Sequence, residues 1–500
     1  MEKRESFGTR LGFLLVSAGC AIGLGNIWKF PYITGQYGGA AFVVIYLICL
    51  VIIGIPVLSM ELTLGRASGQ TIVNAYKKLE GKGGYWHIHG WFCAAGCYIL
   101  MMFYVPVAGW MLNYFWKFVS GQFVEISAMT AANASFDTAA AVNDVFGALM
   151  AKPWEMILFM GIVCVGCFAV CLMGLQKGVE RVTKYMMLGL FALILVLIVH
   201  SFTLGGAKEG LSFYLIPDFK AASEAGLGTV ASAAMSQAFF TLSIGIASME
   251  IFGSYMSKEK SILGESIRIT ILDTVVAISA GLIIFPAVFT YNVDAAAGPP
   301  LIFVTLPTIF AHMPGGRLWG ALFFVFMSFA ALSTVIAVFE NLIATLMDSF
   351  GMSRRKATII NVIAMLVLTL PCIFGFNIWK NVQWHGMDIQ GIEDFIVSNL
   401  LLPTGGLIYT IFCVYHYGWT FENFLTAVNE GNGLKFPAWS RYFLVFVLPP
   451  LITFVLIQGL FDPLNKIFGV LLGSIILALY LQEGRYLYLK KKREKENKEA

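Results

Sequence analysis

The chain has 500 residues, of which 58% are hydrophobic and only 12% are charged, and its formal net charge is +4. The mean hydropathy is +0.78. So few charges cannot cover the surface of a water-soluble protein, so the composition predicts an all-α polytopic membrane protein. We expect its environment to be a lipid bilayer and expect no nucleic-acid partner.

Apolar runs of about 20 residues, the length at which a helix crosses a bilayer, predict twelve spans. They lie near residues 11–37, 40–64, 89–118, 154–174, 183–204, 226–256, 265–290, 318–349, 357–375, 395–417, 440–461 and 464–488. An even number of spans places both termini on one side. Most Lys and Arg residues flank that side, which marks it as cytoplasmic. We therefore expect a multi-pass protein of the plasma membrane with both termini in the cytoplasm.

The first span is interrupted by three glycines and an amide, at Gly19, Gly23, Gly25 and Asn26. A spanning helix can unwind only where its freed peptide groups face protein, water or a ligand. Freed carbonyl oxygens are ligands for a hard cation, and an exposed helix N-terminus attracts an anion. This break predicts a cation and a carboxylate bound together in the middle of the membrane.

A second interruption, at residues 239–248, falls in the sixth span, five spans after the first. Either stretch alone could be a patch of small residues at which helices pack. Interrupted spans at matching places in two halves are typical of inverted-repeat transporters, whose binding site lies where the repeats meet. The pair of interruptions therefore favours a binding site.

Several motifs resemble those of the neurotransmitter:sodium symporter family. Asn-Ile-Trp-Lys-Phe-Pro-Tyr at 26–32 and Gly-Gly-Ala-Ala-Phe at 38–42 are similar to the family's first-span signature, and 54–56, Glu61 and 65–66 look like its second span. The resemblance covers nearly the whole chain. It implies a leucine-transporter fold with broken helices 1 and 6 and sodium-driven uptake of an amino acid or amine.

This resemblance implies a single transmembrane domain over residues 1–500. Its core would be two inverted five-helix repeats, spans 1–5 at about 8–205 and spans 6–10 at about 225–418. Two further helices would follow at about 439–489, and then a basic cytoplasmic tail at 490–500.

The resemblance also implies one or two bound sodium ions, whose ligands would be hard oxygens. The first site would use Ala21, Asn26, Thr241, Asp273 and the substrate carboxylate. The second would use the carbonyls of Gly19, Ile22 and Ala330 with the hydroxyls of Ser333 and Thr334. Outside this context, the two hydroxyls would be read as helix-packing groups that bond their own backbone.

Asp273 departs from the family pattern. Many members have Asn there, and chloride-dependent members also have Ser at the position that is Ala277 here. A carboxylate in mid-span is costly unless it is paired or protonated. We expect Asp273 to supply a fixed negative charge in place of chloride, so that chloride is not required. The alternative is a protonated, hydrogen-bonded structural Asp.

The implied substrate site is apolar and has no charged side chain. Its members would be Gly23, Leu24, Gly25, Leu100, Tyr104, Val107, Phe240, Ser243, Ile246, Thr334 and Val338. Family members that carry biogenic amines have Asp at the position of Gly23, and glycine leaves room there for a substrate carboxylate. A charged substrate side chain would lose its hydration without gaining a partner. We expect a small neutral, apolar L-amino acid.

Matching positions imply two gates. The outer gate would pair Lys29 with Asp394, and an ordinary loop carboxylate is the alternative for Asp394. The inner gate would comprise Arg4, Asp348, Ser254 and Tyr255. Glu61 would hydrogen-bond the broken sixth span.

The sequence as a whole predicts a sodium-coupled symporter that imports its substrate by alternating access, as a monomer or a homodimer. An enzyme would need a nucleophile–base or metal constellation, and the six histidines are scattered at loops and span ends. The remaining alternative is a transporter-like amino acid receptor or sensor without net transport.

Overall fold

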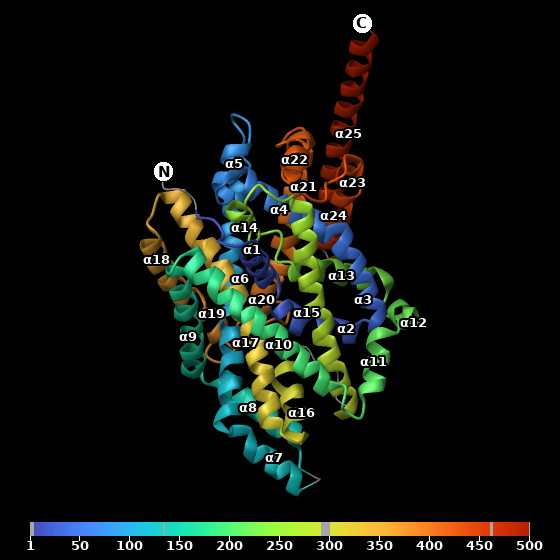
Figure 1. The fold of residues 1–500 in the computed structure, drawn as a ribbon. Coiled ribbons are helices and arrows are strands. Elements are labelled where there is room, and N and C mark those ends of the chain that lie inside the picture. The colour runs from blue at the N-terminus through green and yellow to red at the C-terminus, as the bar shows by residue number, and fades with distance from the viewer. Residues whose placement is uncertain (1–4, 134–135, 292–300, 461–463, 500) are drawn as a thin grey trace.

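The computed structural model describes residues 5–133, 136–291, 301–460 and 464–499. The described residues form helices and contain no named strand, in agreement with the predicted all-α class. Figure 1 places the described N-terminal end and the tip of the C-terminal helix on the same side of the molecule. We call this side the terminal face.

The first half of the chain runs from α1 to α12. Its helices and π-helical segments are α1 (Arg10–Ala21), η1 (Gly25–Lys29), α2 (Phe30–Gln36), α3 (Ala40–Cys49), η2 (Leu50–Gly54), α4 (Ile55–Ser68), α5 (Ile72–Leu79), α6 (His87–Ser120), α7 (Gln122–Ala132), α8 (Thr138–Ala151), α9 (Pro153–Leu172), η3 (Leu175–Glu180), α10 (Arg181–Ser201), α11 (Ala207–Leu215) and α12 (Phe219–Glu224).

The second half begins with another divided helix. Its elements are α13 (Leu227–Thr241), α14 (Glu250–Tyr255), α15 (Ile262–Tyr291), η4 (Leu301–Thr305), α16 (Leu306–His312), α17 (Gly316–Phe350), α18 (Arg354–Leu368), α19 (Leu370–Gly375), α20 (Ile389–Phe395), η5 (Ile396–Leu401), α21 (Leu402–Val414), α22 (Phe421–Val428), α23 (Ser440–Phe446), α24 (Leu448–Gln458) and α25 (Leu464–Glu499).

The spans predicted from hydropathy correspond to these helices. Within the described ranges, ten helices are long and apolar enough to cross a membrane, and the pair formed by α1 and residues 25–36 makes an eleventh span bent by 53°. The sixth predicted span is present as α13 and α14, two short helices that residues 242–249 separate. Both predicted interruptions are therefore confirmed as breaks in helices.

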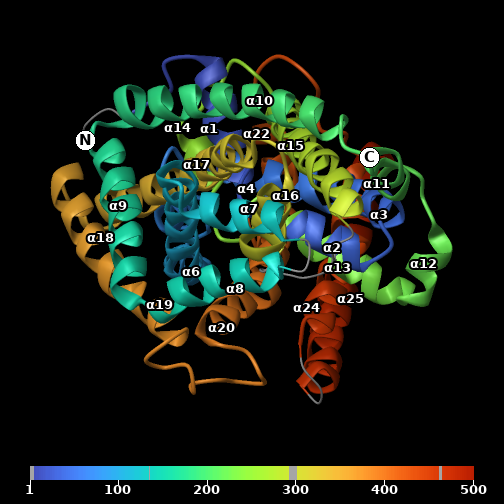
Figure 2. The same cartoon turned by 90° about the horizontal axis from the view of Figure 1, so that it is seen from below.

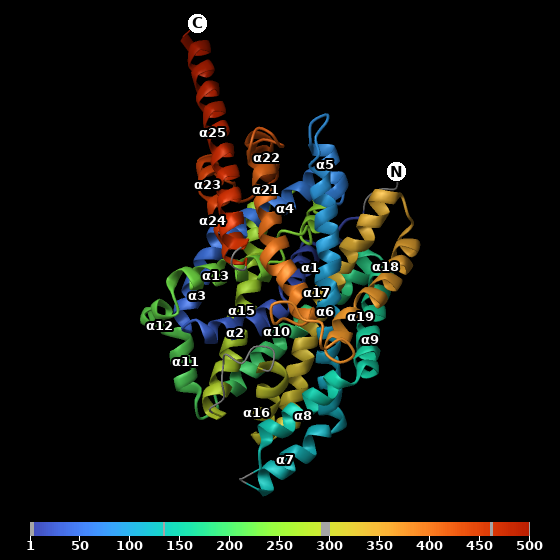
Figure 3. The same cartoon turned by 180° about the vertical axis from the view of Figure 1, so that it is seen from behind.

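The broken helices pack against long central helices. Seen along the bundle in Figure 2, α9, α10, α18 and α11 lie at the periphery, whereas α6, α17 and α4 are central. α17 packs along α6, α10 and α1, and α14 packs against α4. Figure 3 shows α25 extending well beyond the rest of the terminal face.

Local signals account for several helix ends. The Thr9 hydroxyl oxygen accepts a hydrogen bond from the Gly12 amide at 2.9 Å and caps α1, and the Asp388 carboxylate does the same for Gly391 at the start of α20, at 2.8 Å. Such caps satisfy amides that a helix start leaves without partners. α4 ends at Gly69, whose φ of 65° suits glycine.

Candidate functional site

The break in the first span exposes backbone amides toward the centre of the molecule. α1 ends at Ala21, and Ile22 has an extended backbone with ψ of 103°. The Leu24 amide donates to the hydroxyl oxygen of Tyr104 on α6 at 2.9 Å, and the Gly23 amide donates to Asn26 Oδ1 at 3.0 Å. The unwound turn is thus held by side chains in place of helical hydrogen bonds.

The break in the sixth span is held by Glu61 on α4. The Glu61 carboxylate accepts the Gly245 amide through Oε1 and the Met249 amide through Oε2, the latter at 3.3 Å. The segment is strained at two non-glycine residues, since φ is 52° at Ser243 and 63° at Ala247. Glu61 therefore has the supporting position that the sequence predicts for it.

The freed carbonyls at the two breaks have partners that the sequence analysis did not anticipate. Cys97 Sγ contacts the Ile246 carbonyl oxygen at 3.2 Å, and Asn341 Nδ2 donates to that of Ala247 at 3.1 Å. Gln237 Nε2 donates to the Gly25 carbonyl oxygen at 2.8 Å. These side chains come from α6, α17 and α13, and no local sequence pattern links them to the breaks.

Two of the residues predicted for the first sodium site, Asn26 and Thr241, contact a third, Asp273. Its carboxylate accepts hydrogen bonds from Asn26 Nδ2 at 2.7 Å and from the Thr241 hydroxyl at 3.0 Å. Asp273 is fully buried, and no ion pair found among the described residues includes it. A buried carboxylate with only neutral donors fits a place where a cation binds.

Oxygens predicted for the second sodium site converge on Thr334 of α17. Its hydroxyl lies 3.2 Å from the Gly19 carbonyl oxygen, 3.1 Å from that of Ile22 and 3.4 Å from that of Ala330. The Ser333 hydroxyl lies 2.9 Å from the same Ala330 oxygen. One hydroxyl hydrogen can satisfy only one of three acceptors. The convergence of carbonyls and hydroxyls is a donor set that a hard cation prefers.

A central cavity lies between the two breaks. It is lined by Ala21, Gly23, Gly25, Leu100, Tyr104, Phe240, Ser243, Ile246, Thr334 and Leu402. Leu402 was not predicted from the sequence. Val107 and Val338 are buried but do not line this cavity. A Cβ atom at Gly23 would lie 2.2 Å from the Tyr104 hydroxyl oxygen and 2.6 Å from that of Thr334.

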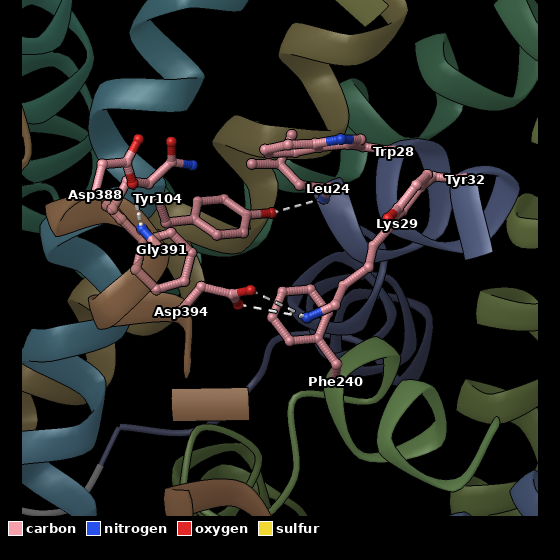
Figure 4. A pocket seen from close by; sticks show the side chains of 11 residues that line it. Leu24, Trp28, Lys29, Tyr32, Tyr104, Phe240, Asp388, Gly391 and Asp394 are labelled. Carbon is pink, nitrogen blue, oxygen red and sulfur yellow. Dashed lines mark hydrogen bonds and ion pairs between the residues drawn. The ribbon is translucent and has the colours of Figure 1, made fainter. Parts of the chain in front are cut away.

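A second, larger cavity, which we call the vestibule, lies beside the central cavity, and Figure 4 shows the side chains that line it. Its volume is about 240 Å³, against about 10 Å³ for the central cavity, which is room for about one water molecule. Leu24, Tyr104 and Phe240 line the vestibule, and Phe240 and Tyr104 line both cavities. Binding of a larger molecule in the centre therefore requires these side chains to move.

The predicted pair of Lys29 and Asp394 crosses the vestibule, as Figure 4 shows. Lys29 Nζ lies 3.4 Å from Asp394 Oδ1 and 3.0 Å from the Ser398 hydroxyl oxygen. The same ammonium lies 4.1 Å from the centroid of the Phe240 ring, a cation–π distance. The charge pair thus contacts an aromatic side chain that lines both cavities.

Of the four residues predicted for the inner gate, the structure describes Asp348, Ser254 and Tyr255. Arg4 lies outside the described residues. The Asp348 carboxylate accepts the Thr71 amide at 2.7 Å, and the Ser254 hydroxyl donates to the carbonyl oxygen of Ile251 at 2.6 Å.

A different charged group, not predicted from the sequence, lies at the terminal face near Tyr255. The Tyr255 hydroxyl donates to Glu340 Oε1 at 2.9 Å. Arg354 donates to both oxygens of Glu340, at 2.7 and 2.9 Å, and to Glu5 Oε2 at 3.1 Å. The Glu340 side chain is fully buried and that of Arg354 is 15% exposed. The bidentate Arg354–Glu340 pair joins α18 to α17, and the Arg354–Glu5 pair joins α18 to the N-terminal segment.

Comparison with known proteins identifies the family. The model of the sodium:neurotransmitter symporter family matches residues 4–145 and 139–468. The chain belongs to this family. The symporter is 33% identical over 459 residues to an uncharacterized sodium-dependent transporter, YhdH of Bacillus subtilis, covering 91% of this chain and 98% of the relative. The sodium- and chloride-dependent GABA transporter 2 of Bos taurus is 24% identical to this chain. The match covers 90% of this chain and 79% of that transporter.

The fold of the symporter also matches a solved transporter structure. The crystal structure of MhsT in complex with L-phenylalanine has a TM-score of 0.80 and 35% sequence identity, and it covers 92% of this chain and 100% of that one. The symporter is therefore a sodium-coupled secondary transporter of the multi-pass membrane type, not an enzyme. The resemblance found in the sequence is confirmed.

Proposed function

We propose that the symporter imports a neutral, apolar L-amino acid together with sodium. The observation that carries this proposal is the crowding around Gly23, where a Cβ atom would lie 2.2 Å from the Tyr104 hydroxyl oxygen. A side chain at this position would occupy the space beside Asn26 and Thr334. Glycine leaves that space to a carboxylate of the substrate.

The substrate carboxylate would bind at the break in the first span. The Leu24 amide and the Tyr104 hydroxyl already meet there, and the positive end of the short helix that follows favours an anion. A sodium ion at Asn26 and Asp273 would bind the same carboxylate. Backbone carbonyls near Phe240 and Ser243 would accept the amino group.

The substrate side chain would lie among apolar groups. Leu100, Phe240, Ile246 and Leu402 line the central cavity, and none of the charged residues that the structure describes does. Removing an ionised side chain from water without a partner costs several kcal/mol, which disfavours acidic and basic amino acids. The amino acid named in the MhsT structure, L-phenylalanine, is of the apolar class that we propose.

Two sodium ions would bind in this arrangement, one at Asp273 and one at Thr334. Asp273 would also supply the negative charge that chloride supplies in chloride-dependent relatives, so transport would not require chloride. Since Asp273 has only neutral donors, sodium would be its counter-ion.

The terminal face would be cytoplasmic and the vestibule extracellular. Lys29 and Asp394 would then close the outer path above Phe240. The group of Glu340, Arg354 and Glu5 would close the inner path, together with Tyr255. Movement of α1 would open the inner side in an alternating-access cycle.

Competition for a labelled substrate tests this proposal. Purified protein is incubated with labelled L-leucine and each of the twenty amino acids, in sodium and in potassium buffer. We expect sodium-dependent binding that apolar amino acids displace and that aspartate, lysine and GABA do not. Absence of sodium-dependent binding by every neutral amino acid would overturn the proposal.

A further inference from the structure

A small pocket on the terminal face lies apart from the transport site. It has a volume of about 130 Å³ and lies between the start of α1, the start of α15 and the loop at residues 432–434. Its lining consists of Arg10, Lys260, Ser261, Gly264, Glu265, Arg268, Asn432, Gly433 and Leu434. Nothing in the proposed transport cycle uses these residues.

Positive charge predominates in this pocket. Arg10, Lys260 and Arg268 are its cationic residues, and Glu265 is the acidic one. Both arginines pair with the same oxygen, Glu265 Oε1, at 2.6 and 2.7 Å. One carboxylate therefore offsets one of three positive charges, and the Arg10 and Arg268 side chains remain 44% and 50% exposed.

The start of α15 contributes a further attraction for anions. α15 is 30 residues long and begins at Ile262, so its first amides and its positive dipole end face the pocket residues Ser261, Gly264 and Glu265. Phosphate and carboxylate groups bind at such helix starts.

Ser261 is the observation that points to a ligand. Its residue surface is 1% exposed, and its hydroxyl has no hydrogen-bond partner among the described residues. A serine in this position normally caps the helix. Here Cβ atoms built at Gly264 and Gly433 would lie 3.5 and 2.7 Å from that hydroxyl oxygen, so it lies next to two glycines of the pocket lining. Since a buried hydroxyl without a partner is costly, a ligand oxygen would stabilise it.

Hydrogen bonds join the two loops that line the pocket. The Ser261 amide donates to the Asn432 carbonyl oxygen at 3.0 Å, and the Asn432 amide donates to that of Glu259 at 2.7 Å. Arg66 Nη1 donates to the Lys260 carbonyl oxygen at 2.7 Å. The two loops are thus fixed relative to each other before any ligand binds.

We propose that this pocket binds a phosphate group. Lys260 and Arg268 would hold its oxygens from two sides, the Ser261 hydroxyl would donate to a third oxygen, and the first amides of α15 would complete the shell. The volume leaves room for a phosphate group, free or on a phospholipid headgroup, together with several water molecules. A group bound there would connect α1, through Arg10, with α15.

Phosphate binding to the full-length protein in detergent tests the proposal. Calorimetric titration with sodium phosphate, at constant ionic strength with chloride as the replaced anion, should show saturable binding. The melting temperature should rise with phosphate concentration, because a ligand of the folded state stabilises it. No saturable binding by phosphate or by a phosphate headgroup would overturn the proposal.

Matched variants assign the site. Lys260→Gln should weaken phosphate binding about tenfold, as expected for loss of a charge-assisted contact. Lys258→Gln is the control, because Lys258 pairs with Glu430 at 3.1 Å and does not line the pocket. Equal binding by the two variants would contradict the assignment.

The Ser261→Ala variant separates a ligand role from a capping role. If the hydroxyl serves the ligand, the phosphate-induced rise in melting temperature shrinks while the melting temperature without phosphate stays equal or rises. If the hydroxyl instead caps the helix, the Ser261→Ala variant should melt at a lower temperature both with and without phosphate. That result would contradict the proposal.

Comparison of phosphatidylcholine nanodiscs with and without phosphatidic acid distinguishes the source of the phosphate. If free phosphate in detergent raises the melting temperature, the ligand is a soluble ion. If only phosphatidic acid raises the melting temperature, and the Lys260→Gln variant loses this rise, the ligand is a lipid headgroup.

Discussion

The Leu24 amide of the broken first span donates a hydrogen bond to the Tyr104 hydroxyl oxygen on α6 at 2.9 Å, and these residues are 80 positions apart in the chain. Gly23, Thr334 and the substrate space lie next to this contact. The hydroxyl is therefore placed to donate its hydrogen to an incoming carboxylate while it accepts from the backbone.

Replacing Tyr104 by Phe should raise the half-saturating concentration of substrate about tenfold or more, since a hydrogen bond to a charged group is lost. Tyr98→Phe is the matched control, because the Tyr98 hydroxyl donates to Asn361 at 2.5 Å and does not line the central cavity. Equal affinities in the two variants, measured by labelled-substrate binding, would exclude Tyr104 as a carboxylate ligand.

A methyl group at Gly23 should block substrate binding. The added Cβ would lie 2.2 Å from the Tyr104 hydroxyl oxygen, and such overpacking costs about 1–3 kcal/mol, so affinity should fall about tenfold or more. Gly166→Ala on α9 is the control, because nothing lies within 4 Å of its Cβ position. Unchanged substrate affinity in Gly23→Ala would contradict the proposed carboxylate position.

Thr334 should determine sodium affinity. Thr334→Val keeps the shape but removes the hydroxyl on which three carbonyls converge, so the sodium concentration for half-maximal binding should rise about tenfold. In the control, Thr453→Val, the lost hydroxyl bonds only its own helix, to Pro449 at 2.7 Å. An equal rise in the half-maximal sodium concentration in both variants would rule out a cation at Thr334.

Asp273 should make transport independent of chloride. We expect equal uptake when gluconate replaces chloride in the wild type. Asp273→Asn removes the fixed charge, and the double variant Asp273→Asn with Ala277→Ser restores the pair of residues that chloride-dependent relatives carry. Uptake by the double variant should then require chloride. Loss of wild-type uptake in gluconate would contradict this role.

The Arg354–Glu340 pair should stabilise the fold, because removing one partner leaves a buried charge. Arg354→Met should lower the free energy of unfolding by about 3–5 kcal/mol, and adding Glu340→Gln should restore part of it. Lys356→Gln, on the exposed side of the same helix, should change it little. A melting temperature unchanged by Arg354→Met would show that the pair is not a structural link.

The sequence predicts the spans and both breaks well, because hydropathy and glycine content act locally. Side-chain partners that depend on distant helices were harder to predict. Leu402 reaches the central cavity from the tenth span, and Asn341 reaches the Ala247 carbonyl from the eighth. No local pattern marks either residue.

The charged group of Glu340 and Arg354 shows the same limit. Arg354 of α18 donates to Glu340 of α17, and no local pattern links the two residues. The contact of Lys29 with the Phe240 ring was not predicted either, because it depends on the three-dimensional path of two helices.

Uptake of labelled L-leucine by proteoliposomes tests the central claim most directly. With an inward sodium gradient, we expect accumulation above the external concentration, and none when potassium replaces sodium or when a sodium ionophore dissipates the gradient. Sodium-dependent binding of neutral amino acids without accumulation would contradict coupled transport and would indicate a receptor.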